Sequence, residues 1–197
     1  MAVSADVVKQ LREQTGAGIM DCKAALTASD GDIDKAIEWL RKKGAASAEK
    51  KSGRATNEGV VEAYIHPGSR LGVLIEVNCE TDFVAKTEAF KTLAKDLAMQ
   101  VAAANPRVIK REDMPQDVVA KEMEIYRTQA SNENKPASVQ ERIAQGKLEK
   151  FYQESVLLEQ NFIKDPTRTV TQVITEVIAK IGENITVRRF VRFHLGE

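Results

Sequence analysis

The sequence predicts an α+β protein in which a bundle of three helices precedes a core of a small antiparallel sheet, of about three strands, packed with helices. Three observations predict this class. Apolar residues recur at helical spacing through residues 1–44. Two alternating runs follow at 60–66 and 71–79, and a third closes the chain at 185–195.

The first 44 residues contain signals for three short helices. Ser4 is predicted to cap the first helix, which ends at the TGAG sequence of residues 15–18. Asp32 is predicted to cap the third helix, and the basic run before Gly44 predicts its end. A bundle this small is only marginally stable alone, so we expect residues 1–44 to be an interaction module.

The rest of the chain is predicted to be a linker followed by the core. Residues 45–58 lack apolar periodicity and predict a charged linker, and residues 59–197 form the core. The PGSR sequence between the first two alternating runs predicts a β-hairpin. The helix after it is predicted to face the sheet with an apolar stripe made of Phe90, Leu93, Ala94, Leu97 and Val101.

The pattern is weaker in the second half of the core. Residues 107–168 are mostly helical and polar in character and are not assigned to particular elements. The pattern is clear again at 170–181, which predicts a helix closed by Gly182 and followed by the third strand. Alternation in that strand separates Arg189 from the neighbouring arginines, which predicts a solvated sheet face rather than an anion site.

Charge and hydropathy limit the function. The chain has 29 basic and 29 acidic residues and a formal net charge of +0, which disfavours general binding to nucleic acid. The start of the chain lacks the pattern of a signal peptide, and the longest apolar run is far too short to cross a membrane. We therefore expect a cytoplasmic protein with neither a nucleic-acid nor a membrane partner.

Few residues are suited to chemistry. Cys22 and Cys79 lie in apolar-periodic segments and lack paired spacing, which predicts buried, reduced thiols and no metal site. Glu80 and Asp82 would raise the pKa of Cys79 if they lie close. The chain has only two histidines and lacks the GxxxxGK[ST] phosphate loop. We expect no enzyme, no catalytic residues and no cofactor.

The sequence CETDFVAK, residues 79–86, joins a predicted strand to a predicted helix and has two interpretations. If the helix already includes this point, Phe83 extends the core stripe seven residues before Phe90, with Asp82 as N-cap. If Thr87 caps the helix instead, Phe83 projects beside a carboxylate and can anchor in a partner's pocket. Periodicity alone favours the first interpretation and leaves the second open.

Two stretches of the sequence resemble the motifs of a known family. LREQTGAGIMDCKAAL (11–26) and EVNCETDFVAK (76–86) closely resemble the two characteristic motifs of bacterial elongation factor Ts. Members of this family are guanine nucleotide exchange factors of the translation GTPase elongation factor Tu. The order of three-helix module, linker, hairpin, TDFV, helix and closing GENITVRRFVRF strand also matches, and the resemblance covers essentially the whole chain.

The resemblance implies a protein without chemistry of its own. It implies that a ubiquitin-associated-like N-terminal bundle and the α+β core both contact the GTPase, with Arg12 and Met20 among the secondary contacts. It also implies a segment that intrudes beside the nucleotide site of elongation factor Tu and dislodges the bound Mg²⁺. That segment is Thr81, Asp82, Phe83 and Val84.

The chain also departs from longer members of the family, which have a second core subdomain and a helical-hairpin insertion. Neither is expected to fit in this chain. A single core half suggests that two chains pair through their sheets, as a homodimer that binds two GTPase molecules.

Two alternatives to an exchange factor stay open. One is a non-catalytic adaptor whose helical bundle binds ubiquitin-like or nascent-chain partners. The other is a small cysteine-dependent enzyme centred on Cys79.

Overall fold

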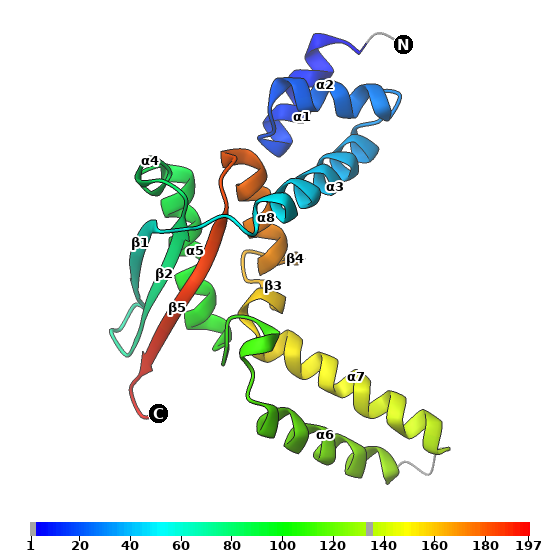
Figure 1. Ribbon diagram of the computed structural model, residues 1–197, viewed down its shortest axis with the longest axis vertical. Helices are drawn as coiled ribbons and strands as arrows, with labels where there is room; N and C mark the ends of the chain where they lie inside the picture. The colour runs from blue at the N-terminus through cyan, green and yellow to red at the C-terminus, as the bar shows by residue number, and fades with distance from the viewer. Residues whose placement is uncertain (1–2, 133–135) are drawn as a thin grey trace. The chain divides into compact units, whose positions relative to one another are not determined.

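The computed structural model describes residues 3–132 and 136–197, and it confirms the predicted α+β class (Figure 1). One sheet contains three strands, β1 (Glu58–Ile65), β2 (Leu71–Cys79) and β5 (Ile185–His194), in the order β1-β2-β5. The chain divides into two compact units, each described by itself. The first comprises Met1–Val60, Val77–Leu93 and Gln172–Thr186, and the second comprises Val61–Glu76, Ala94–Thr171 and Val187–Glu197.

The first unit begins with the predicted three-helix bundle, α1 (Ala5–Thr15), α2 (Ile19–Ala28) and α3 (Ile33–Lys51). The two predicted caps are confirmed. The hydroxyl of Ser4 accepts a hydrogen bond from the Val7 N–H at 3.4 Å, and the Asp32 carboxylate accepts one from the Lys35 N–H at 3.0 Å. The helices bury a shared cluster of Leu11, Cys22, Ala25, Leu26 and Ala36.

The third helix does not end where the sequence predicts. A stop at Gly44 is wrong, because α3 continues to Lys51 through a run of good helix formers. Gly44 is buried, and a Cβ atom there would lie 3.2 Å from the Cβ of Ala179 in α8 (Val170–Ile181). The glycine therefore permits close helix packing. The predicted linker, 45–58, is helical in its first part, and the division of the chain at 1–44, 45–58 and 59–197 stays a prediction.

The predicted hairpin, long helix and third strand are confirmed. The hairpin is β1 (Glu58–Ile65) and β2 (Leu71–Cys79), and the His66 N–H donates to the Leu71 carbonyl at 2.9 Å. The strand β5 (Ile185–His194) lies beside β2 and runs antiparallel to it, since Leu195 N–H donates to Arg70 O at one end. The long helix is α5 (Glu88–Ala104), and its predicted stripe is buried.

The second unit contains a helical hairpin in the region that the pattern left unassigned. Its helices, α6 (Gln116–Ser131) and α7 (Ala137–Ser155), run side by side (Figure 1). The expectation that the chain has no room for such a hairpin is therefore wrong. Residues 133–135, within the region predicted to be mostly helical, lie outside the described residues. The core at the base of the hairpin is Met114, Phe151, Tyr152 and Val156.

A charged cluster joins the base of the hairpin to the segments beside it. Arg111 donates to the carboxylates of Glu149 and Glu159, and its guanidinium lies 4.2 Å from the centre of the Tyr152 ring. These carboxylates hold the pKa of Arg111 above its ordinary value. The short elements here are η1 (Arg111–Asp113), η2 (Leu157–Glu159), β3 (Asn161–Phe162) and β4 (Asp165–Thr169).

Within the described parts of the chain, none of the helices combines the length and the hydropathy needed to span a lipid bilayer.

We predict that Gly59→Ala destabilises the protein strongly. Gly59 has a φ of 153°, and a Cβ atom there would lie 2.2 Å from the Val77 carbonyl oxygen and 2.7 Å from the Asn78 Cα. The backbone of β2 must move to relieve this overlap, so the free energy of unfolding should fall by about 3 kcal/mol in urea denaturation. Gly53→Ala is the matched control, because nothing lies within 4 Å of its Cβ position. Equal stability of the two variants would contradict the close approach.

Candidate functional site

The CETDFVAK segment forms a separate short helix, α4 (Asp82–Ala85), between β2 and α5. Thr81 is its N-cap, and its hydroxyl accepts a hydrogen bond from the Val84 N–H at 3.4 Å. The predicted role of Asp82 as N-cap is therefore wrong. Thr87 accepts from the Phe90 N–H at 3.3 Å, so its predicted role as cap of the next helix is confirmed.

Phe83 lies on the surface and not in the core. Its side chain is 79% exposed, although Ala85 in the same short helix is buried. The core-stripe interpretation is wrong because α4 and α5 are distinct helices, so the spacing to Phe90 does not place both rings on one helical face. An exposed aromatic ring of this kind is typical of a contact surface.

An ion pair lies beside the exposed ring. The Lys86 ammonium is 2.6 Å from a carboxylate oxygen of Asp82 and 6.0 Å from the centre of the Phe83 ring. The hydrogen bond from Lys86 lowers the pKa of Asp82, and the same bond raises the pKa of Lys86. Both groups are therefore charged at neutral pH, and the surface offers an apolar ring next to a carboxylate. Because the pair is exposed, its contribution to stability is small.

The backbone at the start of α4 is held by a residue that sequence reasoning missed. Glu183, which follows α8, accepts hydrogen bonds from the backbone N–H groups of Glu80 and Thr81 and from the Thr81 hydroxyl. The available signal was the GEN sequence at 182–184, which pairs a helix-ending glycine with a carboxylate and an amide. That sequence alone does not reveal a partner about a hundred residues away.

Cys79 lies directly before this segment as a buried thiol, as predicted. Its sulfur donates to the Thr81 carbonyl at 3.2 Å. Burial first, and then the negative charges of Glu183 and Glu58, raise the pKa of Cys79 to about 11. The predicted rise in the pKa of Cys79 is confirmed, but the acidic residues responsible are Glu183 and Glu58 and not the Glu80 and Asp82 named from the sequence. A thiol so little ionised is a poor nucleophile, which weighs against the cysteine-dependent enzyme.

The other predicted contact residues lie on the helical bundle. Arg12 is on α1 and is exposed, and Met20 is on α2 with 74% of its side chain exposed. Ile19 beside it is also exposed. The bundle therefore has an apolar surface of its own at the start of α2, separate in sequence from Thr81, Asp82, Phe83 and Val84.

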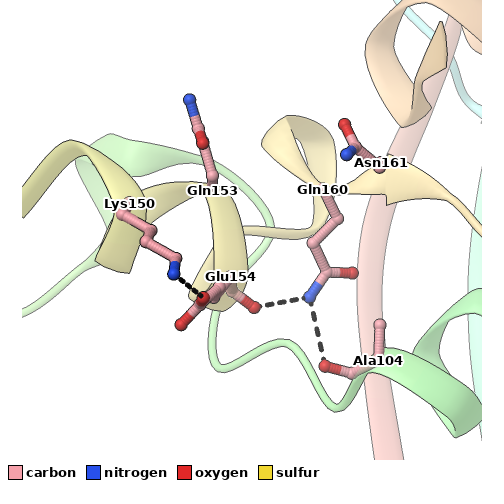
Figure 2. Close-up of a pocket in the computed structure, with 6 residues that line it drawn as sticks. All are labelled: Ala104, Lys150, Gln153, Glu154, Gln160 and Asn161. Atoms are coloured by element: carbon pink, nitrogen blue, oxygen red, sulfur yellow. Dashed lines mark hydrogen bonds and ion pairs between the residues drawn. The ribbon is translucent and has the colours of Figure 1, made fainter. Parts of the chain in front are cut away.

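A surface hollow of about 390 Å³ in the second unit lies among polar side chains (Figure 2). The Gln160 amide donates to the carbonyl oxygens of Ala104 and Glu154, and Lys150 lies 3.8 Å from the Glu154 carboxylate. The buried Gln100 amide donates to the Gln160 side chain at 3.1 Å. The Gln160 amide thereby links the end of α5 to the end of α7. No group of three metal-binding side chains is assembled in the ranges 3–132 and 136–197.

A braced helical turn with an exposed ring, together with a small helical bundle that has its own exposed apolar side chains, is typical of proteins that act by contact with a partner. The comparisons identify the family. The family model described as Elongation factor TS matches residues 8–197. The chain therefore belongs to the elongation factor Ts family, a family of translation elongation factors.

Three relatives named Elongation factor Ts illustrate how complete the similarity is. The protein of Moorella thermoacetica is 64% identical over 197 residues, which cover 100% of this chain and 97% of the relative. The protein of Carboxydothermus hydrogenoformans is 63% identical, covering 99% and 90% of the two chains. The protein of Caldanaerobacter subterraneus is 62% identical, covering 99% and 98%.

We predict that the Cys79 thiol reacts slowly near neutral pH. Because its pKa is raised from 9.0 to about 11, the folded protein should have about 100-fold less thiolate than the unfolded chain below pH 9. Reaction of a Cys22→Ala variant with a thiol reagent, with and without urea, measures the difference. Fast reaction of the folded variant at pH 7 would restore the cysteine-dependent enzyme as an alternative.

Proposed function

We propose that the protein promotes release of GDP from elongation factor Tu during translation elongation. Membership of the elongation factor Ts family supports this role. The observation on which it rests is the exposed ring of Phe83 beside the ionised Asp82. In this proposal Thr81, Asp82, Phe83 and Val84 insert beside the nucleotide site of the GTPase and dislodge the bound Mg²⁺. The protein performs no bond-making chemistry itself.

Such a role requires no nucleotide pocket on the factor. An exchange factor lowers the affinity of the GTPase for GDP by binding the nucleotide-free form more tightly, and this coupling is reciprocal. Burial of one Phe side chain contributes roughly 1.5 to 3 kcal/mol, or about one to two powers of ten in an equilibrium constant. Other contacts must supply the remainder, and the exposed Arg12 and Met20 of the bundle are our candidates. We therefore propose that both the bundle and the core contact the GTPase.

The proposed place of action is the cytoplasm, where translation occurs. Cys22 and Cys79 are free thiols in the structure, which is consistent with a reducing compartment.

The first test is the release of labelled GDP from purified elongation factor Tu. The wild-type protein should accelerate release, and Phe83→Ala should reduce the acceleration by about 10- to 100-fold because the buried ring is lost from the complex. The melting temperature should be unchanged, since the ring is exposed in the free protein.

Ile163→Ala is the matched control, because it also removes an exposed apolar side chain but lies outside the segment. If the wild-type protein has no effect on release, the exchange function is wrong and the adaptor alternative is favoured. A parallel loss of stability in Phe83→Ala would also count against the proposal.

We further propose that two copies of the chain pair through their sheets and bind two GTPase molecules. Apolar side chains are exposed on each of the three strands, although such strands usually bury their apolar face. These side chains are Val61, Ile65, Leu74, Val191 and Phe193.

Two contacts place these side chains on one face of the sheet. A Cβ atom at Gly72 would lie 3.0 Å from the Ile65 side chain, so Gly72, and with it Leu74 two residues on, faces the same side as Ile65. Arg189 of β5 lies 2.7 Å from Glu76 of β2, which places Arg189 on that side as well. Residues two apart share a face, so the exposed apolar residues gather there, with an ion pair among them. A second copy offers the same apolar surface.

We predict that Phe193→Glu converts a dimer into a monomer, because a carboxylate buried in the paired faces would have no partner. Sedimentation at micromolar concentration measures the change. Val139→Glu on α7 also replaces an exposed apolar residue by an acid and should stay dimeric. A wild-type protein that sediments as a monomer would contradict the pairing.

A further inference from the structure

We propose that Glu183 is the positioning residue that sets the presentation of Phe83 to the GTPase, an inference that rests on the proposed exchange function. Glu183 lies about a hundred residues after Phe83 in the chain and is half-buried. It does not need to touch the partner. Its effect is exerted through the backbone and hydroxyl of Thr81, the residue at which α4 begins.

The carboxylate of Glu183 accepts three hydrogen bonds from Glu80 and Thr81, directly before α4. One oxygen accepts hydrogen bonds from the Glu80 N–H at 3.1 Å and the Thr81 N–H at 3.0 Å. The other accepts from the Thr81 hydroxyl at 2.7 Å. Hydrogen bonds to an ionised acceptor are stronger than neutral ones, so this one side chain fixes both the backbone and the rotamer of Thr81.

The hydrogen bond from the Thr81 hydroxyl to Glu183 also leaves this hydroxyl as the acceptor that caps α4. Because the Thr81 hydroxyl donates its proton to Glu183, its lone pairs are free to accept the Val84 N–H at 3.4 Å. A helix of a single turn has little stability of its own, since nucleation is unfavourable and its end groups lack partners. The geometry of α4, and with it the direction of the Phe83 side chain, therefore depends on this external acceptor.

Glu183 is itself held in place by reciprocal contacts. Gly182, with a φ of 89°, ends α8 and turns the chain toward β5. The carboxylate of Glu80 accepts from the Asn184 N–H at 2.6 Å, so Glu80 and Glu183 each accept backbone donors of the other segment. The Asn184 side chain, which is buried, donates to the carbonyls of Ser52 and Arg54 at 3.3 and 3.0 Å.

Removal of the Glu183 carboxylate should change the orientation of the Phe83 side chain more than the free energy of unfolding. The Thr81 N–H and hydroxyl are exposed and can bond to water when Glu183 is absent, and of its three donors only the Glu80 N–H is part-buried, so we expect the fold to tolerate the loss. The start of α4 then samples other conformations, and Phe83 occupies the competent one for less of the time. The apparent affinity for the GTPase falls in proportion to the fraction of molecules that hold Phe83 in the binding-competent conformation.

The test compares three substitutions in the GDP-release assay. Glu183→Ala should lower the efficiency of exchange about tenfold, the value of a few charge-assisted hydrogen bonds partly replaced by water. Glu183→Asp should behave similarly because the shorter side chain does not reach Thr81. Glu183→Gln should recover most of the activity, since its amide oxygen can accept the backbone donors and its NH₂ group can bond to the hydroxyl. Glu38→Ala, which removes an exposed carboxylate paired with Lys42, is the control.

A double-mutant cycle with Phe83→Ala separates positioning from a general structural effect. If Glu183 acts through Phe83, Glu183→Ala should cost little in the Phe83→Ala background. An equal loss in both backgrounds, or a loss that follows the melting temperature across the three substitutions, would overturn the proposal.

Hydrogen exchange keeps the inference separate from the proposed function. Glu183→Ala should speed exchange of the Thr81 and Val84 amides, whether or not the protein acts on elongation factor Tu. A wild-type protein without effect on GDP release would remove the exchange function, and with it the role of Glu183 in that function. Unchanged amide exchange in Glu183→Ala would show that Glu183 does not fix the start of α4, and would overturn the proposal.

Discussion

The exchange of hydrogen bonds between Glu80 and Glu183 is the interaction on which the exposed segment depends. Each carboxylate accepts backbone donors from the other residue's segment, so the end of β2 and the start of β5 are held together at the point where α4 begins. Long-range contacts of this kind form only when the rest of the unit is folded. The exposed ring of Phe83 is therefore a product of the complete fold and not of its own short segment.

This arrangement explains how an apolar side chain can stay exposed on a stable protein. The helix α4 needs almost no core of its own, because Ala85 is its one buried residue, and hydrogen bonds to Glu183 hold the chain where the helix begins. A ring that is not used for folding is free to be buried in a partner instead. The same division of roles holds in the bundle, where Leu11 and Leu26 form the core and Met20 stays outside.

Sequence reasoning succeeded where the signal was local and failed where it depended on distant residues. Ser4 and Asp32 are caps that bond within their own helices, so both could be predicted. The extension of α3 through Gly44 could not, because the glycine accommodates Ala179 of another helix. The hairpin of α6 and α7 buries apolar residues mainly at its base, so its periodicity is weak. Phe83 was ambiguous because its spacing from Phe90 is the same whether one helix or two connect them.

The amide cluster at the base of that hairpin has a mechanical consequence. Gln100 of α5 bonds to the side chain of Gln160 and to the backbone of Asn161 and Ile163, while Gln160 bonds to the backbone of Ala104 and Glu154. Interlocked buried amides resist sliding, because a shift of one turn would leave several polar groups without partners. A force applied along α7 would therefore be transmitted to α5, because the hydrogen-bonded amides keep the ends of the two helices from moving independently.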